Sequence, residues 1–304
     1  MSSKPSIEQT LEAAVLARIA NDTDPRFQAI MSSLIKHLHA FVREVELTEE
    51  EWFEGIKFLT ATGQKCDDKR QEFILLSDVL GVSMLVDAIN HRRPETCTQN
   101  TVLGPFFVHG APEIQNGGDM APGWQGEPTF CHGRVIGTDG KPIAGAVLDL
   151  WQSNDEGFYD VQLESFDEHK LRARLKTDAE GSYRFRTIKP TSYPVPTDGP
   201  VGLILDRMGR HPMRPAHLHV AITAPGYETL VTHLFVKGDP YIESDVVFGV
   251  KPSLIVDFAR NTSEEAAKKA GLKAPFTEAH FDFVLKPAEG NKLQKMIAPS
   301  DAAA

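Results

Sequence analysis

The spacing of apolar residues in this 304-residue chain changes once, near Pro128. Before that point apolar residues recur at steps of three and four, as in the stretch from Phe27 to Val45, which is typical of amphipathic helices. After it, short runs alternate with a period of two and are separated by turns such as Asp139-Gly140 and Pro225-Gly226. The sequence therefore predicts an α+β protein, with an N-terminal helical domain followed by a mainly antiparallel β-sandwich.

The first part of the chain contains four helical patterns. We expect helices over residues 6–20, from Pro25 to Val45, from Thr48 to Ala61, and as one segment from Phe73 to Ile89. Pro25 suits a first helical turn, and Thr48 with Glu51 forms a capping-box pattern. These helices have more apolar surface than one small layer needs, which makes a partner subunit a second interpretation beside a monomeric core.

Composition shifts suggest four segments. We expect a helical dimerisation domain at 1–92, a connector at 93–127 that contributes to a pocket, a β-sandwich at 128–288, and a loosely held tail at 289–304. Strands are predicted at Thr129–Ile136, Ala146–Trp151, Leu171–Lys176, Tyr183–Arg186, Pro215–Thr223 and Thr229–Phe235. No helix is expected between these strands, and a mixed segment should close the sandwich by Leu285.

Charge and composition exclude several classes of protein. The formal net charge of −10 argues against nucleic acid and anionic membranes as partners. No apolar run is long enough to span a bilayer, and the N-terminal sequence MSSKPSIEQT lacks the apolar core of a secretory signal. Three widely spaced cysteines form neither a disulfide framework nor a zinc knuckle. We therefore expect a cytoplasmic protein that neither binds nucleic acid nor inserts into a membrane.

The segment from Arg214 to Val220 contains a histidine pair suited to metal binding. In a strand, His217 and His219 point to the same face, about 6.5–7 Å apart along the chain. An apolar row that includes Leu218 marks the other face, so we expect a half-buried strand. His37 and His39 have the same spacing within a helical pattern, where the two side chains point to different faces and cannot converge on one ion.

Three motifs together resemble the intradiol ring-cleaving dioxygenases, which hold a non-haem ferric ion. Tyr159 ends Gly157-Phe158-Tyr159 and Tyr193 begins Tyr-Pro-Val-Pro-Thr-Asp-Gly-Pro, 24 residues before His217 in Arg-Pro-Ala-His-Leu-His. By position alone, each tyrosine would be a structural residue. The resemblance implies one Fe(III) per chain, held by Tyr159, Tyr193, His217 and His219, with Tyr193 as the ligand that leaves and takes a substrate proton. It further implies that Arg214 stabilises the anion that develops.

The resemblance also implies a pocket for a small aromatic diol or triol, with O2 as the second substrate. Its lining would be Leu75, Asp78, Val102, Leu103, Gly104, Pro105, Phe106, Val195, Pro196, Arg214 and Val247. Asp78 is the one acidic member, and its surroundings are most similar to the branch of the family that cleaves hydroxyquinol. Buried without a partner, this carboxylate would be costly, so we expect a local hydrogen bond or a ligand. The resemblance further implies a homodimer through the N-terminal helices, with room for a lipid at that interface. His233 lies where relatives that cleave catechol often carry glutamine, which leaves its role open.

Three other interpretations remain open. Within the family, catechol or chlorocatechol could be the substrate. The segment from Gly133 to Trp151 also resembles transthyretin-like sandwiches that bind ligands without catalysis. A zinc hydrolase built on His217 and His219 would need a third ligand, and no residue is clearly spaced for that role.

Overall fold

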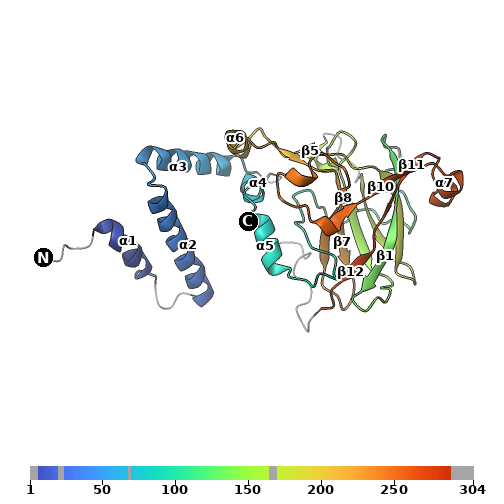
Figure 1. The fold of residues 1–304 in the computed structure, drawn as a ribbon, viewed down its shortest axis with the longest axis horizontal. Coiled ribbons are helices and arrows are strands. Elements are labelled where there is room, and N and C mark those ends of the chain that lie inside the picture. The colour runs from blue at the N-terminus through green and yellow to red at the C-terminus, as the bar shows by residue number, and fades with distance from the viewer. Residues whose placement is uncertain (1–5, 20–23, 68–69, 164–169, 289–304) are drawn as a thin grey trace. The chain divides into compact units, whose positions relative to one another are not determined.

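The computed structural model describes residues 6–19, 24–67, 70–163 and 170–288 (Figure 1). The chain divides by packing into two compact units, Met1–Ala61 and Thr62–Ala304, which are described separately below. This division falls earlier than the expected boundary at residue 92, because the helix Glu72–Val79 packs against the later helix Pro200–Arg207. The expected segment boundaries stay predictions, and the tail at 289–304 lies outside the described residues.

The first unit consists of α1 (Ile7–Leu16), α2 (Pro25–Glu44) and most of α3 (Glu49–Gln64). Pro25 occupies the first turn of α2, and the carboxylate of Asp24 accepts the Phe27 N–H at 2.7 Å. The capping box at the start of α3 is formed as predicted: Glu51 Oε2 accepts the Thr48 N–H at 3.0 Å, and Thr48 Oγ1 accepts the Glu51 N–H at 3.2 Å. None of the α2 residues is buried. Among the described residues, no helix is long and apolar enough to cross a membrane.

The predicted helix from Phe73 to Ile89 is two helices, α4 (Glu72–Val79) and α5 (Val82–Asn90). Gly81 separates them with a φ of +75°, a left-handed conformation that ends the first helix. The carboxylate of Glu72 accepts the Val201 N–H at 3.1 Å, near the start of the next helix in the chain. That helix, α6 (Pro200–Arg207), lies between two strands, so the expectation of an uninterrupted series of strands was wrong.

The strands of the second unit form two five-stranded sheets and one two-stranded sheet (Figure 1). One sheet has the order β10-β11-β1-β12 with β4 on β1, the other has the order β3-β2-β7-β8-β9, and β5 pairs with β6. The bounds are β1 (Pro128–Gly137), β2 (Val147–Trp151), β3 (Arg172–Lys176), β4 (Ser182–Ile188), β5 (Tyr193–Pro194), β6 (Met213–Arg214), β7 (His217–Thr223), β8 (Leu230–Val236), β9 (Ile255–Val256), β10 (Phe258–Asn261), β11 (Phe276–His280) and β12 (Phe283–Leu285). All six predicted strands are present, and pairing is mainly antiparallel, with parallel pairs of β1 with β11 and β12 and of β8 with β9. The helix α7 (Glu264–Ala270) connects β10 to β11.

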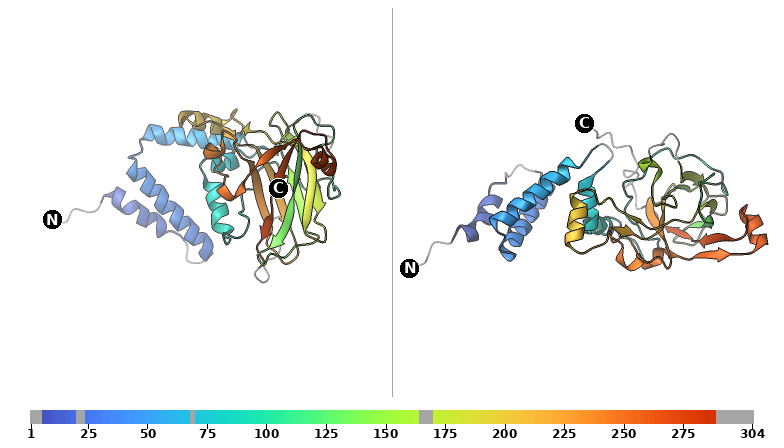
Figure 2. Two further views of the ribbon diagram at one scale, coloured as in Figure 1. Left: turned by 45° about the vertical axis from the view of Figure 1, so that its right-hand side comes forward. Right: turned by 90° about the horizontal axis from the view of Figure 1, so that it is seen from above.

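The main core lies between the two sheets, as expected for a sandwich (Figure 2). From β7 it receives Leu218, Val220 and Ile222, so the other face of this strand presents His217 and His219. That second face is also buried, not half-exposed as expected, because the connector covers it. The connector is joined to β8 by the Thr101 N–H, which donates to Val231 O at 2.8 Å. The histidine pair therefore lies in a closed interior.

Candidate metal centre

Four side chains from three separate segments converge on one point of the second unit. Tyr159 precedes the 3-10 helix η1 (Asp160–Gln162), Tyr193 begins β5, and the two histidines lie on β7. Tyr159 Oη lies 3.2 Å from Tyr193 Oη, 3.4 Å from His217 Nε2 and 2.9 Å from His219 Nε2, and the two Nε2 atoms are 3.2 Å apart. Donor atoms that share one ion at bonds of about 2.0–2.2 Å lie about 3 Å apart. The spacing matches such a ligand set.

His217 presents a lone pair to this point, and both histidine rings are neutral. Arg214 can only donate, and its Nη1 approaches His217 Nε2 at 3.2 Å, so Nε2 is the acceptor nitrogen. The other nitrogen, Nδ1, donates to Pro215 O at 2.7 Å. Burial, followed by the charge of Arg214, lowers the pKa of His217 to about 3, and burial with His233 and His217 lowers the pKa of His219 well below its usual value. Both rings are neutral, the form that binds a metal.

The two tyrosines supply hard oxygen donors. Burial raises the pKa of Tyr159 well above its usual value, Tyr193 adds to that effect, and the charges of Arg214 and Arg172 oppose it. Such a phenol keeps its proton unless a cation compensates the buried phenolate. Two oxygens and two imidazole nitrogens suit iron, whereas the soft thiolates that select other metals do not enter the donor set. The cluster fits a non-haem iron site.

Arg214 forms a buried ion pair beside the donors. Its Nε donates to Asp245 Oδ1 at 3.2 Å and its Nη2 to Asp245 Oδ2 at 3.4 Å, and Oδ2 also accepts the Gly249 N–H at 2.9 Å. Burial disfavours the charged guanidinium, but Asp245 and the neighbouring tyrosines outweigh it and raise the pKa of Arg214. A fixed cation therefore lies next to the donor atoms and can stabilise an anion there.

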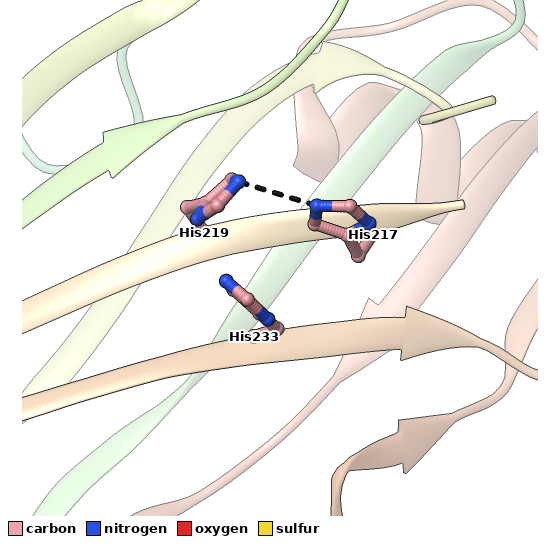
Figure 3. A group of neighbouring side chains, drawn as sticks. All are labelled: His217, His219 and His233. Atoms are coloured by element: carbon pink, nitrogen blue, oxygen red, sulfur yellow. Dashed lines mark hydrogen bonds between the residues drawn. The ribbon is translucent and has the colours of Figure 1, made fainter. Parts of the chain in front are cut away.

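His233 is a third imidazole at this centre (Figure 3). It pairs with His219 across β7 and β8, it is fully buried, and one ligand atom from each of His217, His219 and His233 lies within 4.8 Å of the others. Neither ring nitrogen of His233 has a hydrogen-bond partner among the described residues. The sequence alone had offered no third ligand for the zinc interpretation. The structure places one, because strand pairing joins positions that are 14 residues apart.

Close packing holds the donor side chains. Trp151 stacks on His219 with ring centroids 4.6 Å apart, and Phe106 stacks on Tyr159 at 4.4 Å. A Cβ on Gly104, whose φ is +77°, would lie 3.3 Å from His219 Cε1. The connector therefore stacks on Tyr159 and leaves little room for a side chain beside His219.

The predicted pocket residues fall into several groups. Leu75, Val195 and Val247 share one apolar cluster with Val79. Leu103 and Phe106 pack on the cluster that holds the two tyrosines, and Gly104 faces His219. Val102 and Pro196 are half-buried and Pro105 is exposed, so the roles of these three stay predictions. A cavity of about 500 Å³ borders Asp245, but its lining includes none of the four donors.

Asp78 is half-buried near the end of α4 and is not without a partner. Burial raises the pKa of its carboxyl group, while a hydrogen bond with Ser83 and the charge of Arg214 partly offset the rise. The charges of Arg214 and Asp245 act on Asp78, so the carboxyl group lies within electrostatic range of the candidate centre. The local hydrogen bond expected as one alternative is therefore present.

Sequence reasoning missed several residues that hold the site. Asp245, the partner of Arg214, lies 31 residues further along the chain. Asp160, directly after Tyr159, forms a buried ion pair with Arg172. The one available signal was the position of Asp160 next to a motif tyrosine. His37 and His39 belong to α2 and not to the cluster, as their helical spacing predicted.

Comparisons with known proteins agree with this geometry. A family model described as "Dioxygenase" matches residues 102–287, and one described as "Catechol dioxygenase N terminus" matches residues 24–98. A 6-chlorohydroxyquinol 1,2-dioxygenase of Cupriavidus pinatubonensis is 54% identical over 280 residues, which are 92% of this chain and 98% of that protein. A hydroxyquinol 1,2-dioxygenase of a Rhizobium species is 50% identical over 281 residues, which are 92% of this chain and 95% of that protein.

A solved structure leads to the same assignment. The crystal structure of hydroxyquinol 1,2-dioxygenase from Pseudomonas putida superposes with a TM-score of 0.88 at 50% identity and covers 93% of this chain and 99% of that chain. The family match, the extent of these alignments and the Tyr/His cluster lead to one conclusion. The chain belongs to the intradiol catechol dioxygenase family, and it is an enzyme of that family.

Proposed function

We propose that this enzyme cleaves hydroxyquinol (1,2,4-trihydroxybenzene) with O2, between the two adjacent hydroxyl-bearing carbons, to give 3-hydroxy-cis,cis-muconate, the tautomer of maleylacetate. The observation that carries the proposal is the convergence of four donor atoms beside a buried arginine, with Tyr159 Oη 2.9–3.4 Å from the other three. Relatives at 50–54% identity that are named for hydroxyquinol or its 6-chloro derivative support the choice of ring.

One Fe(III) per chain is the proposed cofactor, held by Tyr159, Tyr193, His217 and His219. A bound ferric ion would draw electron density out of a coordinated catecholate ring and make it reactive towards O2. The neutral histidines and the two phenol oxygens supply the hard and borderline donors that such an ion prefers.

The two tyrosines have different proposed roles. Tyr159 is fully buried and its Oη contacts both histidine Nε2 atoms and Tyr193 Oη, so it stays in place. Tyr193 is 6% exposed and begins a strand of only two residues, so its side chain is the easier one to displace. When the substrate binds, the Tyr193 oxygen accepts one of its hydroxyl protons. The Arg214 guanidinium then stabilises the negative charge that develops on the ring and its oxygens.

Asp78 is the proposed recognition group for the third hydroxyl. Its carboxyl group lies within electrostatic range of Arg214, and its helix α4 contributes Leu75 and Val79 to the apolar cluster that contains Val247. A hydroxyl on the substrate ring would replace water at this carboxyl group. Catechol lacks that hydroxyl and would leave the carboxyl group without the bond, which favours hydroxyquinol over catechol.

The N-terminal helices form the proposed homodimer interface. Three apolar residues of α2, Leu34, Leu38 and Phe41, are 47–52% exposed, which is unusual for a row of large apolar side chains. A lipid bound between these helices would cover part of the same surface. A cytoplasmic location fits the three free thiols of Cys66, Cys97 and Cys131.

Iron analysis, visible spectroscopy and O2 uptake on the purified protein test the proposal. We expect about one iron per chain, a red-brown tyrosinate-to-iron absorption that shifts on addition of substrate, and one O2 consumed per hydroxyquinol, with kcat/KM higher for hydroxyquinol than for catechol. A colourless protein with neither iron nor ring cleavage would support the non-catalytic binding module instead. A higher kcat/KM for catechol or chlorocatechol would contradict the proposed substrate but not the proposed ring-cleavage reaction.

A further inference from the structure

A buried ion pair follows directly after the ligand Tyr159. Asp160 and Arg172 are 4% and 3% exposed, and the guanidinium binds the carboxylate through two nitrogens, with Nε donating to Oδ2 at 2.6 Å. The same carboxylate accepts the Val161 N–H at 2.9 Å and the Lys170 N–H at 3.1 Å. Each carboxylate oxygen thus has two donors, which compensates its burial and holds the segment that carries Tyr159.

The third nitrogen of the same guanidinium reaches the connector. Arg172 Nη1 donates to Phe106 O at 3.1 Å. The ring of Phe106 stacks on the ring of Tyr159, with centroids 4.4 Å apart and planes inclined by 22°. One rigid, planar group is therefore bonded to both segments whose rings lie against each other.

We infer that Arg172 is a positioning residue that couples the metal ligand Tyr159 to the pocket residue Phe106. By holding Asp160 and Phe106 O together, it sets the orientation of the Tyr159 phenol towards the donor cluster and keeps the Phe106 ring in the wall of the substrate pocket. This inference rests on the proposed function, in which Tyr159 is a ligand and Phe106 lines the pocket.

The same strand provides a matched control. Arg174 lies two residues after Arg172 on β3, and it pairs with Asp149 in the same two-nitrogen manner, at 2.9 and 3.1 Å. Its side chain is 33% exposed, and Asp149 faces it in register on β2. A lysine at position 174 would lose the two-nitrogen bond to Asp149. That ion pair contacts neither Phe106 O nor Asp160, so its loss should not affect Tyr159.

The test compares Arg172→Lys with Arg174→Lys in the full-length, iron-loaded enzyme. Lysine keeps the charge at each position but cannot bind Asp160 and Phe106 O together. We expect Arg172→Lys to raise KM for hydroxyquinol about tenfold, the effect of losing one hydrogen bond from a charged donor, and to shift the tyrosinate absorption band. Arg174→Lys should stay within about twofold of wild type and keep the band in place.

A second variant keeps the inference testable if Arg172→Lys does not fold. Phe106→Ala removes the stacked ring and leaves the ion pair intact, so it should shift the band in the same direction. In the Phe106→Ala background, Arg172→Lys should cause little further rise in KM, because both changes act on the same contact. The inference is overturned if Phe106→Ala leaves the band of wild type unchanged, or if Arg172→Lys and Arg174→Lys behave alike.

The spectrum of the wild-type enzyme separates this inference from the proposed function. A wild-type protein without iron, or with iron but no tyrosinate absorption, contradicts the proposed function. A wild-type protein that has both, but whose band and KM are insensitive to Arg172 and Phe106, contradicts the coupling alone.

Discussion

His219 and His233 face each other across β7 and β8, with ring centroids 4.2 Å apart and ring planes at 87°. Neither His219 Nδ1 nor either nitrogen of His233 has a hydrogen-bond partner among the residues that the structure describes. By contrast, His217 Nδ1 donates to Pro215 O. A metal-binding histidine usually donates its second ring N–H to a fixed group, and loss of that group costs about 10–100-fold in metal affinity. His233 is the imidazole that faces His219, so we expect it to accept the second N–H of His219 once a metal is bound.

His233→Leu should therefore release iron to a chelator about tenfold faster than wild type, whereas His233→Gln keeps a polar acceptor and should lose less. In the metal-free protein, His233→Leu should instead be more stable to heat than wild type. Leucine removes an unpaired buried imidazole and should raise the melting temperature. Chelator kinetics and thermal unfolding measure the two effects. If all three proteins release iron at the same rate, His233 does not support His219.

Gly104→Ala should weaken the metal centre. The new Cβ would lie 3.3 Å from His219 Cε1, so the imidazole of His219 must shift. Gly110→Ala is the control, because Gly110 has a similar φ of +80°, but a Cβ added there would meet no atom of the described residues within 4 Å. Both variants should lose about 1 kcal/mol of stability from backbone strain. Iron content after dialysis should fall only for Gly104→Ala. Equal iron content in the two variants would show that the space beside His219 does not affect iron binding.

Tyr159→Phe and Tyr193→Phe should not be equivalent. Tyr159 Oη contacts three other donor atoms in a fully buried position, so its loss should reduce iron retention and change the resting colour strongly. Tyr193→Phe should keep more iron and lose most ring cleavage, because the oxygen that accepts the substrate proton is missing. Iron analysis, visible spectra and kcat distinguish the two. The same iron content, spectrum and kcat in both variants would contradict the assigned roles.

Asp78→Asn and Asp78→Ala should narrow the preference for hydroxyquinol over catechol. A hydrogen bond to a charged group contributes about 1.5–3 kcal/mol, or roughly ten- to a hundredfold in relative kcat/KM. The change should come mainly from slower cleavage of hydroxyquinol. Parallel kinetics on the two substrates measure it, and an unchanged ratio would exclude Asp78 as the recognition group.

The stability of Asp78→Asn should depend on pH in a defined direction. Burial raises the pKa of Asp78 in the folded protein, so the folded state holds this proton more tightly than the unfolded state. Ionisation therefore costs folding free energy as the pH rises above the unfolded pKa of about 3.9. The variant lacks this cost, so its melting temperature should exceed that of wild type near pH 7. The difference should shrink as the pH falls towards about 4, and a difference that does not depend on pH would contradict this account.

Leu34→Glu combined with Leu38→Glu should dissociate the proposed dimer. Burying two unpaired carboxylates in an apolar interface should raise the dissociation constant by more than about tenfold. Lys36→Glu, which changes an exposed polar position of the same helix, is the control and should remain dimeric. Analytical ultracentrifugation measures the masses. A wild-type monomer, or a double variant that stays fully dimeric, would contradict the proposed interface.

The sequence by itself determined the local features of this protein. Pro25 and the Thr48–Glu51 box define helix starts because capping depends on a few neighbouring residues. The alternation around His217 and His219 places both rings on one face, since side-chain direction in a strand follows from backbone geometry alone. The order of the tyrosine and histidine motifs pointed to the family. The break at Gly81 was missed because an isolated glycine does not reveal whether it adopts a positive φ.

Only the tertiary structure decided which distant residues meet. The pairing of His219 with His233, the ion pair of Asp160 with Arg172, and the close approach of the Gly104 backbone to His219 each join separate segments. Strand register and loop packing bring these atoms together, and neither can be read from local periodicity, because each is selected by the burial of the whole core. The sequence therefore indicated which donors a metal would need, and the fold placed them about 3 Å apart in a closed interior.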